Sequence, residues 1–336
     1  MISQLGRISI MSAVLLAFAA LVLASSSEKT ELDPNATCNY TLVKKKTLGV
    51  DPSFWKKFFK HLIPFTSSRG KVQFILFKRD FADCGRELVV GRCGKPEELR
   101  ASMPVIQTDF NVIVCDWSKT STNVNYYEVA KTVEDMGALL AELVRYLNQE
   151  ANMHYDDVYV IGHSLGAQIA GSAGKQIMPY RFNTIYALDP AGPQFREKSD
   201  EYRIDASDAS YVESIQTSVS FGFEQPVGHA TFYPNYGKNQ KKCYVYGCSH
   251  KRSHDYFIES LTSPAGFWGP RCERHDDGSW VLLMSDGEFR MGGEPSIPKN
   301  GTFYVKTYSK PPYAMGHRWQ TEPPPREDDV ENSTEE

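Results

Sequence analysis

The stretch Ile-Gly-His-Ser-Leu-Gly-Ala, residues 161–167, constrains the fold of this chain more than any other part of it. An apolar strand pattern at 158–161 precedes it, and a helix pattern of small residues continues to Lys175. A strand, Gly-x-Ser-x-Gly and a helix in this order predict a tight turn that presents Ser164 as a nucleophile. The two glycines leave room beside the turn, and the N-terminus of the helix points at developing negative charge.

Residues 1–24 have the pattern of a secretory signal peptide, with Arg7 before an apolar run and small residues at the cleavage position. A membrane anchor is the alternative, but the apolar run is short and is interrupted by Ser9 and Ser12. Asn-x-Ser/Thr sequons further along the chain agree with the secretory route. We therefore expect a secreted, extracellular protein.

The chain has seven cysteines, so in an oxidising compartment we expect disulfides and at least one unpaired thiol. Cys115 lies inside an apolar run and is the expected buried free thiol. Cys243 and Cys248 enclose only four residues and are expected to pair. A local bridge between the second and third cysteines would leave the first with the last, but the sequence leaves the partners of four cysteines open: Cys38, Cys84, Cys93 and Cys272.

Apolar runs alternate with helical patterns, which favours a mostly parallel central sheet with helices on both faces, an α/β fold. The expected strands are 71–77, 111–116, 158–162, 182–188, 211–217 and 302–308. The expected helices are 126–150, 165–177 and 253–261.

The chain divides into four expected parts: the leader at 1–24, an N-terminal extension at 25–70, one α/β domain at 71–310 and a Pro-rich acidic tail at 311–336. The tail has the composition of a disordered segment. Within the extension, residues 53–62 predict an amphipathic helix with aromatic residues on one side and lysines on the other. Such a helix either packs on its own domain or lies on a membrane surface, and both interpretations stay open.

A serine hydroxyl becomes a good nucleophile only when a base removes its proton, and the base needs an orienting carboxylate. In this kind of turn the chain order is Ser, acid, His. Asp189 ends an apolar strand one strand–helix unit after Ser164, at the edge of the sheet where functional groups gather. Of the eight histidines, His250 fits the base best, but the residues themselves leave His229 and His254 open.

Five motifs in order resemble the pancreatic-type lipase family, particularly its short secreted phospholipase A1 branch in insects. They are GHSLGA at 162–167, LDPAGP at 188–193, DASDA at 205–209, GHATFYPN at 228–235 and CSHKRS at 248–253. The likeness runs from about residue 71 to 308 and implies the α/β-hydrolase fold, with no cofactor required. It also implies that Ser164 is the nucleophile, Asp189 the orienting acid and His250 the general base.

The resemblance implies a calcium site as well, because some relatives hold this ion at a matching position. The matching residues here are Asp200, Arg203, Asp205 and Asp208. Carboxylate oxygens suit calcium, and ordinary solvated acids are the alternative interpretation.

Two features bear on the substrate. The loop that matches the family's lid lies between Cys243 and Cys248 and holds four residues, too few to cover a site. Polar headgroups then have access, which favours a phospholipase A1 that releases the sn-1 acyl chain at a membrane or lipoprotein surface, with no nucleic-acid partner. The family's C-terminal lipid-binding domain is not found in this sequence.

The chain departs from the family at the oxyanion hole. One donor is the backbone N–H of Leu165, and the second normally follows a strand that ends in His-Gly, a dipeptide absent from this sequence. Either that strand is missing between Leu88 and Asn111, or residues 71–77 are the oxyanion strand, with Lys78 or Arg79 as donor. This departure supports an alternative function, a weak or inactive lipase-like binder of lipids or partners that resembles the family's yolk proteins.

Overall fold

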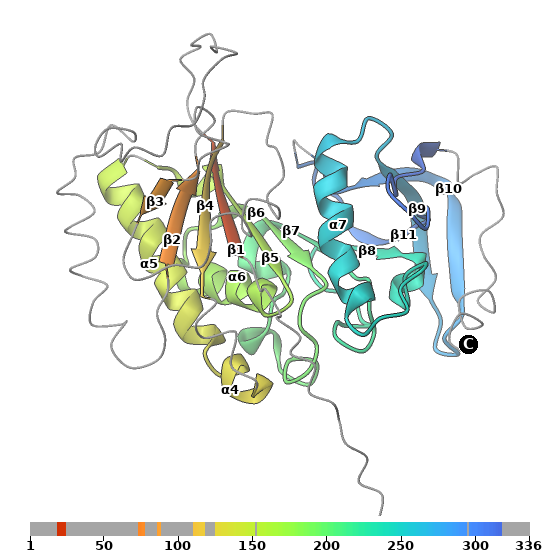
Figure 1. The fold of residues 1–336 in the computed structure, drawn as a ribbon, viewed down its shortest axis with the longest axis horizontal. Helices are drawn as coiled ribbons and strands as arrows, with labels where there is room; N and C mark the ends of the chain where they lie inside the picture. Colours follow the sequence, from red (N-terminus) through yellow and green to blue (C-terminus); the bar gives the residue numbers. More distant parts are fainter. Residues whose placement is uncertain are drawn as a thin grey trace, which may run out of the picture.

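The computed structural model describes residues 19–24, 73–77, 86–88, 110–117, 125–151, 153–293 and 296–317. In this part of the chain one sheet of eleven strands has the order β10-β9-β11-β8-β7-β6-β5-β1-β4-β2-β3 (Figure 1). The strands are β1 Ala19–Ala24, β2 Gln73–Phe77, β3 Arg86–Leu88, β4 Phe110–Asp116, β5 Val158–His163, β6 Phe182–Leu188, β7 Ala209–Ile215, β8 Ala230–Pro234, β9 Phe267–Arg274, β10 Trp280–Met291 and β11 Gly301–Val305.

The centre of the sheet is parallel, as the sequence predicts. β5 pairs with β6, β6 with β7, β7 with β8, and β8 with β11, all in parallel register. The flanks are antiparallel: β9 and β10 on one side, and β1, β4, β2 and β3 on the other. Parallel strands end at the same edge, so the residues that follow β5 and β6 lie near each other.

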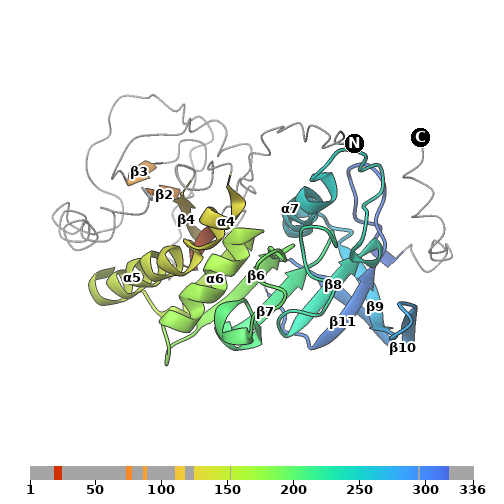
Figure 2. The same ribbon diagram turned by 90° about the horizontal axis from the view of Figure 1, so that it is seen from below.

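Helices cover both faces of this sheet. In Figure 2, α5 and α6 lie on one side of the central strands and α7 on the other. Two clusters of buried apolar side chains match these layers: one joins α5 and α6 to the sheet, and the other joins α7 to it. The α-helices are α4 Tyr126–Ala130, α5 Val133–Ala151, α6 Leu165–Gln176 and α7 Cys248–Thr262; the short 3-10 turns are η2 Tyr155–Asp157, η3 Asp200–Tyr202, η4 Ala206–Asp208 and η5 Asn235–Gly237.

Sequence periodicity locates the central elements well and the later strands poorly. The predicted strand at 182–188 matches β6 residue for residue, whereas the helix predicted at 126–150 is divided into α4 and α5. β8 is short and fully buried, β9 contains Pro270, and β10 is mostly exposed or half-buried, with a register shift between Leu283 and Glu288. None of these three strands has the alternating pattern that identifies a strand from sequence.

The predicted boundary at residue 311 needs correction. Tyr313, Ala314 and Met315 are buried, and the backbone N–H groups of Tyr313 and Ala314 donate to the carboxylate of Glu259 on α7. The packed body therefore continues through residue 317. The rest of the predicted tail and the predicted helix at 53–62 lie outside the described residues.

The cysteines confirm one expected disulfide. Cys243 and Cys248 form a bond with their Cα atoms 5.3 Å apart, and Cys115 is buried, as expected. Cys272 is a buried thiol in β9, and burial raises its pKa to about 12. The other three cysteines whose pairing the sequence leaves open, Cys38, Cys84 and Cys93, lie outside the described residues.

The last six residues of the predicted leader form β1, which lies between β4 and β5 and pairs with both in antiparallel register. The signal peptide stays a prediction, and it has a structural consequence: cleavage after Ala24 removes this strand. None of the helices that the structure describes is long and apolar enough to cross a bilayer.

We expect a chain that begins at Ser25 to be less stable than the full chain, because β4 and β5 then lose the backbone hydrogen bonds of their shared neighbour. Urea unfolding and size-exclusion chromatography of the two forms measure this effect. Equal unfolding midpoints and equal monomer fractions would contradict a structural role for β1.

Candidate active site

The turn between β5 and α6 holds Ser164 in a strained backbone conformation, with φ 56° and ψ −123°. A Cβ atom on Gly162 would lie 2.3 Å from the carbonyl oxygen of Gly166, so a larger residue does not fit there. The turn is also tied to the next strand, since the Ser164 N–H donates to the Leu188 carbonyl at 3.0 Å and the Ala191 N–H donates to the Ser164 carbonyl at 3.1 Å. Local strain held by surrounding contacts is typical of functional turns.

The carboxylate of Asp189 lies directly after β6, at the same edge as Ser164, and is fully buried. Its Oδ1 accepts the backbone N–H groups of Thr217 and Ser218 at 2.8 and 3.1 Å, and its Oδ2 accepts the Ser218 hydroxyl at 2.5 Å. The Nδ1–H of His250 also donates to Oδ2, at 2.5 Å. These four donors fix the carboxylate and orient the imidazole.

The structure places His250 in the first turn of α7, between two aromatic rings. The His163 ring lies 4.4 Å from it and the Phe221 ring 4.9 Å, the latter nearly parallel to the imidazole. Its Nε2 is buried and has no hydrogen-bond partner among the described residues. With Nδ1 held by Asp189, this second nitrogen is the one available to take a proton from a nucleophile.

The other two histidines that the sequence left open lie elsewhere. His229 accepts the backbone N–H of Val212 at 3.0 Å, and burial, together with Arg181, lowers its pKa. His254 follows one turn after His250 on α7, 3.8 Å from the carboxylate of Asp255. Of the three histidines, His250 is the one that the fold brings to Asp189.

Leu165 is buried and is the first residue of α6. Its N–H therefore belongs to the first helical turn, where the N–H groups lack acceptors within the helix. This is the position expected of an oxyanion donor. The alternative that residues 71–77 are the oxyanion strand is wrong: β2 is separated from β5 by β4 and β1, and it ends at the opposite edge from Ser164. The strand next to β5 is β1.

The carboxylates at the position that matches the calcium site already pair with basic side chains of this chain. The Lys175 ammonium pairs with Asp205 at 2.5 Å and also with Asp208, and Arg203 pairs with Asp200 at 2.5 Å. Burial raises the pKa of Asp208 to about 7 despite Lys175; for Asp205, hydrogen bonds from Lys175 and Ser207 outweigh burial and hold the pKa below its usual range. The described residues contain no group of three or more His, Cys, Asp or Glu side chains placed to hold a metal.

A calcium ion therefore does not fit this cluster while the ammonium of Lys175 lies between the two carboxylates. The ion stays a prediction from the resemblance, and no catalytic role is derived from it.

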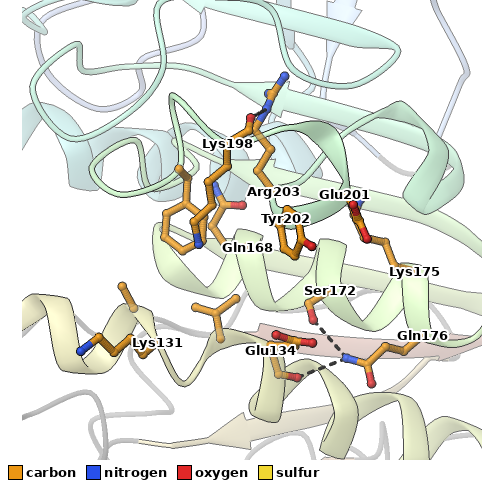
Figure 3. A pocket seen from close by; sticks show the side chains of 13 residues that line it. Lys131, Glu134, Gln168, Ser172, Lys175, Gln176, Lys198, Glu201, Tyr202 and Arg203 are labelled. Atoms are coloured by element: carbon orange, nitrogen blue, oxygen red, sulfur yellow. Dashed lines mark hydrogen bonds between the residues drawn. The ribbon is translucent and has the colours of Figure 1, made fainter.

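A cavity of about 190 Å³ lies against α6, where Gln168, Lys175 and Phe195 line it (Figure 3). Gln168 connects its wall to the candidate site, because the side-chain amide donates to the Ala191 carbonyl at 2.8 Å and accepts the Ile204 N–H at 2.9 Å. Ser164 does not line this cavity. We therefore assign the residues that line this cavity a packing role beside the turn of Ser164.

The sequence does not single out two neighbours of the triad, Ser218 and Phe221, whereas His163 lies beside Ser164 in the motif and is expected to pack at the turn. Ser218 lies in an irregular segment after β7, and only folding brings its hydroxyl to Asp189. The sequence signal at His163 is its position beside Ser164, and its Nε2 lies 3.1 Å from the backbone carbonyl of His250. No sequence pattern marks Phe221.

Known proteins match the part of the chain that contains the candidate site. The sequence profile of the Lipase family matches residues 94–313. Pancreatic lipase-related protein 2 of Cavia porcellus is 38% identical over 175 residues, which are 50% of this chain and 40% of that protein. Phospholipase A1 VesT1.02 of Vespa tropica is 34% identical over 218 residues, 62% of this chain and 72% of that protein. Phospholipase A1 of Vespa crabro is 31% identical over 257 residues, 74% of this chain and 80% of that protein.

The substitution Gly162→Ala should lower the free energy of unfolding by about 1–3 kcal/mol, because the new methyl group overlaps the Gly166 carbonyl. Urea unfolding measures the loss. Gly247→Ala is the control: it has φ +81° but no atom within 4 Å of the added methyl group, so it should cost only about 1 kcal/mol. Equal losses in the two variants would show that the close contact at the turn is unimportant.

The substitution Lys175→Met should destabilise the protein by about 2–4 kcal/mol, since it leaves the buried Asp208 carboxylate without its cation. In the parent chain we expect a chelator and added Ca²⁺ to leave the melting temperature unchanged. In the variant, where no lysine pairs with the two carboxylates, added Ca²⁺ should raise the melting temperature. A melting temperature of the parent chain that falls with chelator would establish a resident divalent ion.

Proposed function

The chain belongs to the Lipase family and has the α/β-hydrolase fold, and on this basis we propose that it is a secreted phospholipase A1 with a Ser164–Asp189–His250 triad. The observation that carries the proposal is the 2.5 Å contact between Asp189 and His250 beside the strained turn of Ser164. The chain spans 40% of the pancreatic lipase-related protein and 72% of the Vespa tropica phospholipase. Activity, substrate and secretion are therefore proposals here.

In the proposed reaction, three side chains, one backbone N–H and water carry every step. His250 Nε2 takes the Ser164 proton while Oγ bonds to the acyl carbon, and the Leu165 N–H stabilises the oxyanion. The imidazolium, held by Asp189, then gives its proton to the departing lysophospholipid alcohol. Water attacks the acyl-enzyme with His250 again as base, which releases a fatty acid and restores Ser164.

Phospholipid is favoured over neutral triglyceride by the loop beside the site. Cys248 begins the helix that carries His250, and the disulfide leaves only four residues between its two cysteines. A loop of this length leaves room for a polar headgroup above the triad. The names of the Vespa relatives agree with this choice, since both are phospholipases A1.

A lipase-like binder is the second candidate function. The absence of a His-Gly dipeptide and the position of β1 next to β5 favour it, because both concern the second oxyanion donor. Loss of one donor reduces the rate by about 10²–10³, which weakens a hydrolase without abolishing catalysis. The intact set of triad side chains favours the enzyme.

We expect a fluorophosphonate probe to label the protein, and Ser164→Ala to abolish both labelling and release of fatty acid from phospholipid. His250→Gln and Asp189→Asn should each reduce hydrolysis by roughly 10⁴. His229→Gln is the matched control and should keep most of the activity. Absence of labelling in a protein with a cooperative unfolding transition would favour the binder.

A further inference from the structure

The most exposed large apolar side chains of the described residues form one row in the loop 243–248. Tyr244, Val245 and Tyr246 are 73%, 76% and 80% exposed, and the next most exposed, Tyr127, reaches 60%. A single exposed apolar residue needs no explanation, but a contiguous group of them indicates a contact surface. We call these three residues the apolar tip.

The apolar tip stands beside the candidate active site. The Tyr246 ring packs edge-on against Phe221 at 4.8 Å, and Phe221 stacks on the imidazole of His250 at 4.9 Å. A surface that contacts the tip therefore lies close to the triad.

The loop is fixed in this outward position. The disulfide closes it, the Cys248 N–H donates to the Val245 carbonyl at 2.9 Å, and Gly247 adopts φ +81°, a conformation that glycine allows. Because the loop is already ordered, contact with a partner costs little conformational entropy.

The segment that carries the tip is positively charged, although the whole chain has a formal net charge of −4. Residues 238–252 contain four lysines and one arginine and no acidic residue. Among these, Lys242 and Lys251 are exposed on either side of the loop. Exposed aromatic residues flanked by lysines suit a surface that is apolar inside and negatively charged outside.

We propose that the apolar tip inserts into the surface of an anionic phospholipid bilayer, while Lys242 and Lys251 contact the headgroup phosphates. This anchor would hold the triad at the level of the acyl esters. It deepens the proposed function by naming the docking surface, and its biological meaning depends on that function. Binding itself can be measured without turnover.

The experiment uses the full chain with Ser164→Ala, which keeps vesicles intact, and measures co-sedimentation with vesicles of phosphatidylcholine plus phosphatidylglycerol or of phosphatidylcholine alone. We expect binding to the anionic vesicles only. Tyr244→Ser with Val245→Ser should weaken it at least about tenfold, because two apolar side chains no longer insert. Lys242→Gln should weaken it about fivefold at low salt and little at high salt.

The control is Tyr180→Ser, a 57% exposed tyrosine that precedes β6 at the opposite edge of the sheet from Asp189. It should bind like the parent chain. Unchanged binding of the double variant, or equal binding to neutral and anionic vesicles, would overturn the proposal.

A second readout separates this proposal from the proposed function. With Ser164 restored, Tyr244→Ser with Val245→Ser should hydrolyse a soluble short-chain ester at the parent rate but lose activity on anionic vesicles. Loss of both activities would contradict a role limited to docking. Failure of the parent chain to cleave either substrate, while it still binds vesicles, would reject the hydrolase and leave the anchor intact.

Discussion

The buried contact between Asp189 and His250 holds the candidate site together. A carboxylate without solvent is unfavourable unless hydrogen bonds replace its water, and Asp189 obtains four of them. The donors come from two other parts of the chain, the segment after β7 and the first turn of α7. The Asp189 carboxylate at the end of β6 therefore holds in place two segments that lie outside β6. Removing any of them weakens the orientation of the imidazole.

Contacts of helix α6 fix the position of the nucleophile. The helix N-terminus follows Ser164, its first turn is fixed by Gln168, and its last turn is held by Lys175, which pairs with the carboxylates of Asp205 and Asp208 at the η4 turn. Gly171 and Gly174 allow the helix to approach Asp208, since an added Cβ atom would lie within 2.7 and 2.1 Å of it. The position of the nucleophile thus depends on contacts along the whole helix.

The sequence predicted the centre of this molecule because its signals are local. The apolar runs that become β5 and β6, and the Gly-x-Ser-x-Gly between strand and helix, need no distant partner to be identified. The disulfide of four enclosed residues is equally local. The choice of His250 over His229 rested on a resemblance, because only the fold shows which imidazole reaches Asp189.

Features made by distant contacts could not be predicted in this way. Ser218 and Phe221 belong to an irregular segment, and they gain their roles only when that segment reaches Asp189 and His250. The buried residues 313–315 follow a Pro-rich stretch that suggests a tail, yet they pack because Glu259 accepts their backbone N–H groups. β10 is an edge strand that is mostly exposed or half-buried, and β9 beside it ends in charged, exposed residues, so the hydrophobic pattern is weak there.

In the chain that keeps its predicted leader, the direction of β1 prevents this strand from presenting a second oxyanion donor. A strand parallel to β5 would end at the edge where Ser164 lies, and the residue after it would present an N–H there. β1 is antiparallel, so its first residue, Ala19, pairs with Gly162 at that edge, and its last residues point away. β4 has the parallel direction, but it is one strand further from the nucleophile. Within the described residues, the N–H of Leu165 is thus the donor that the fold itself positions.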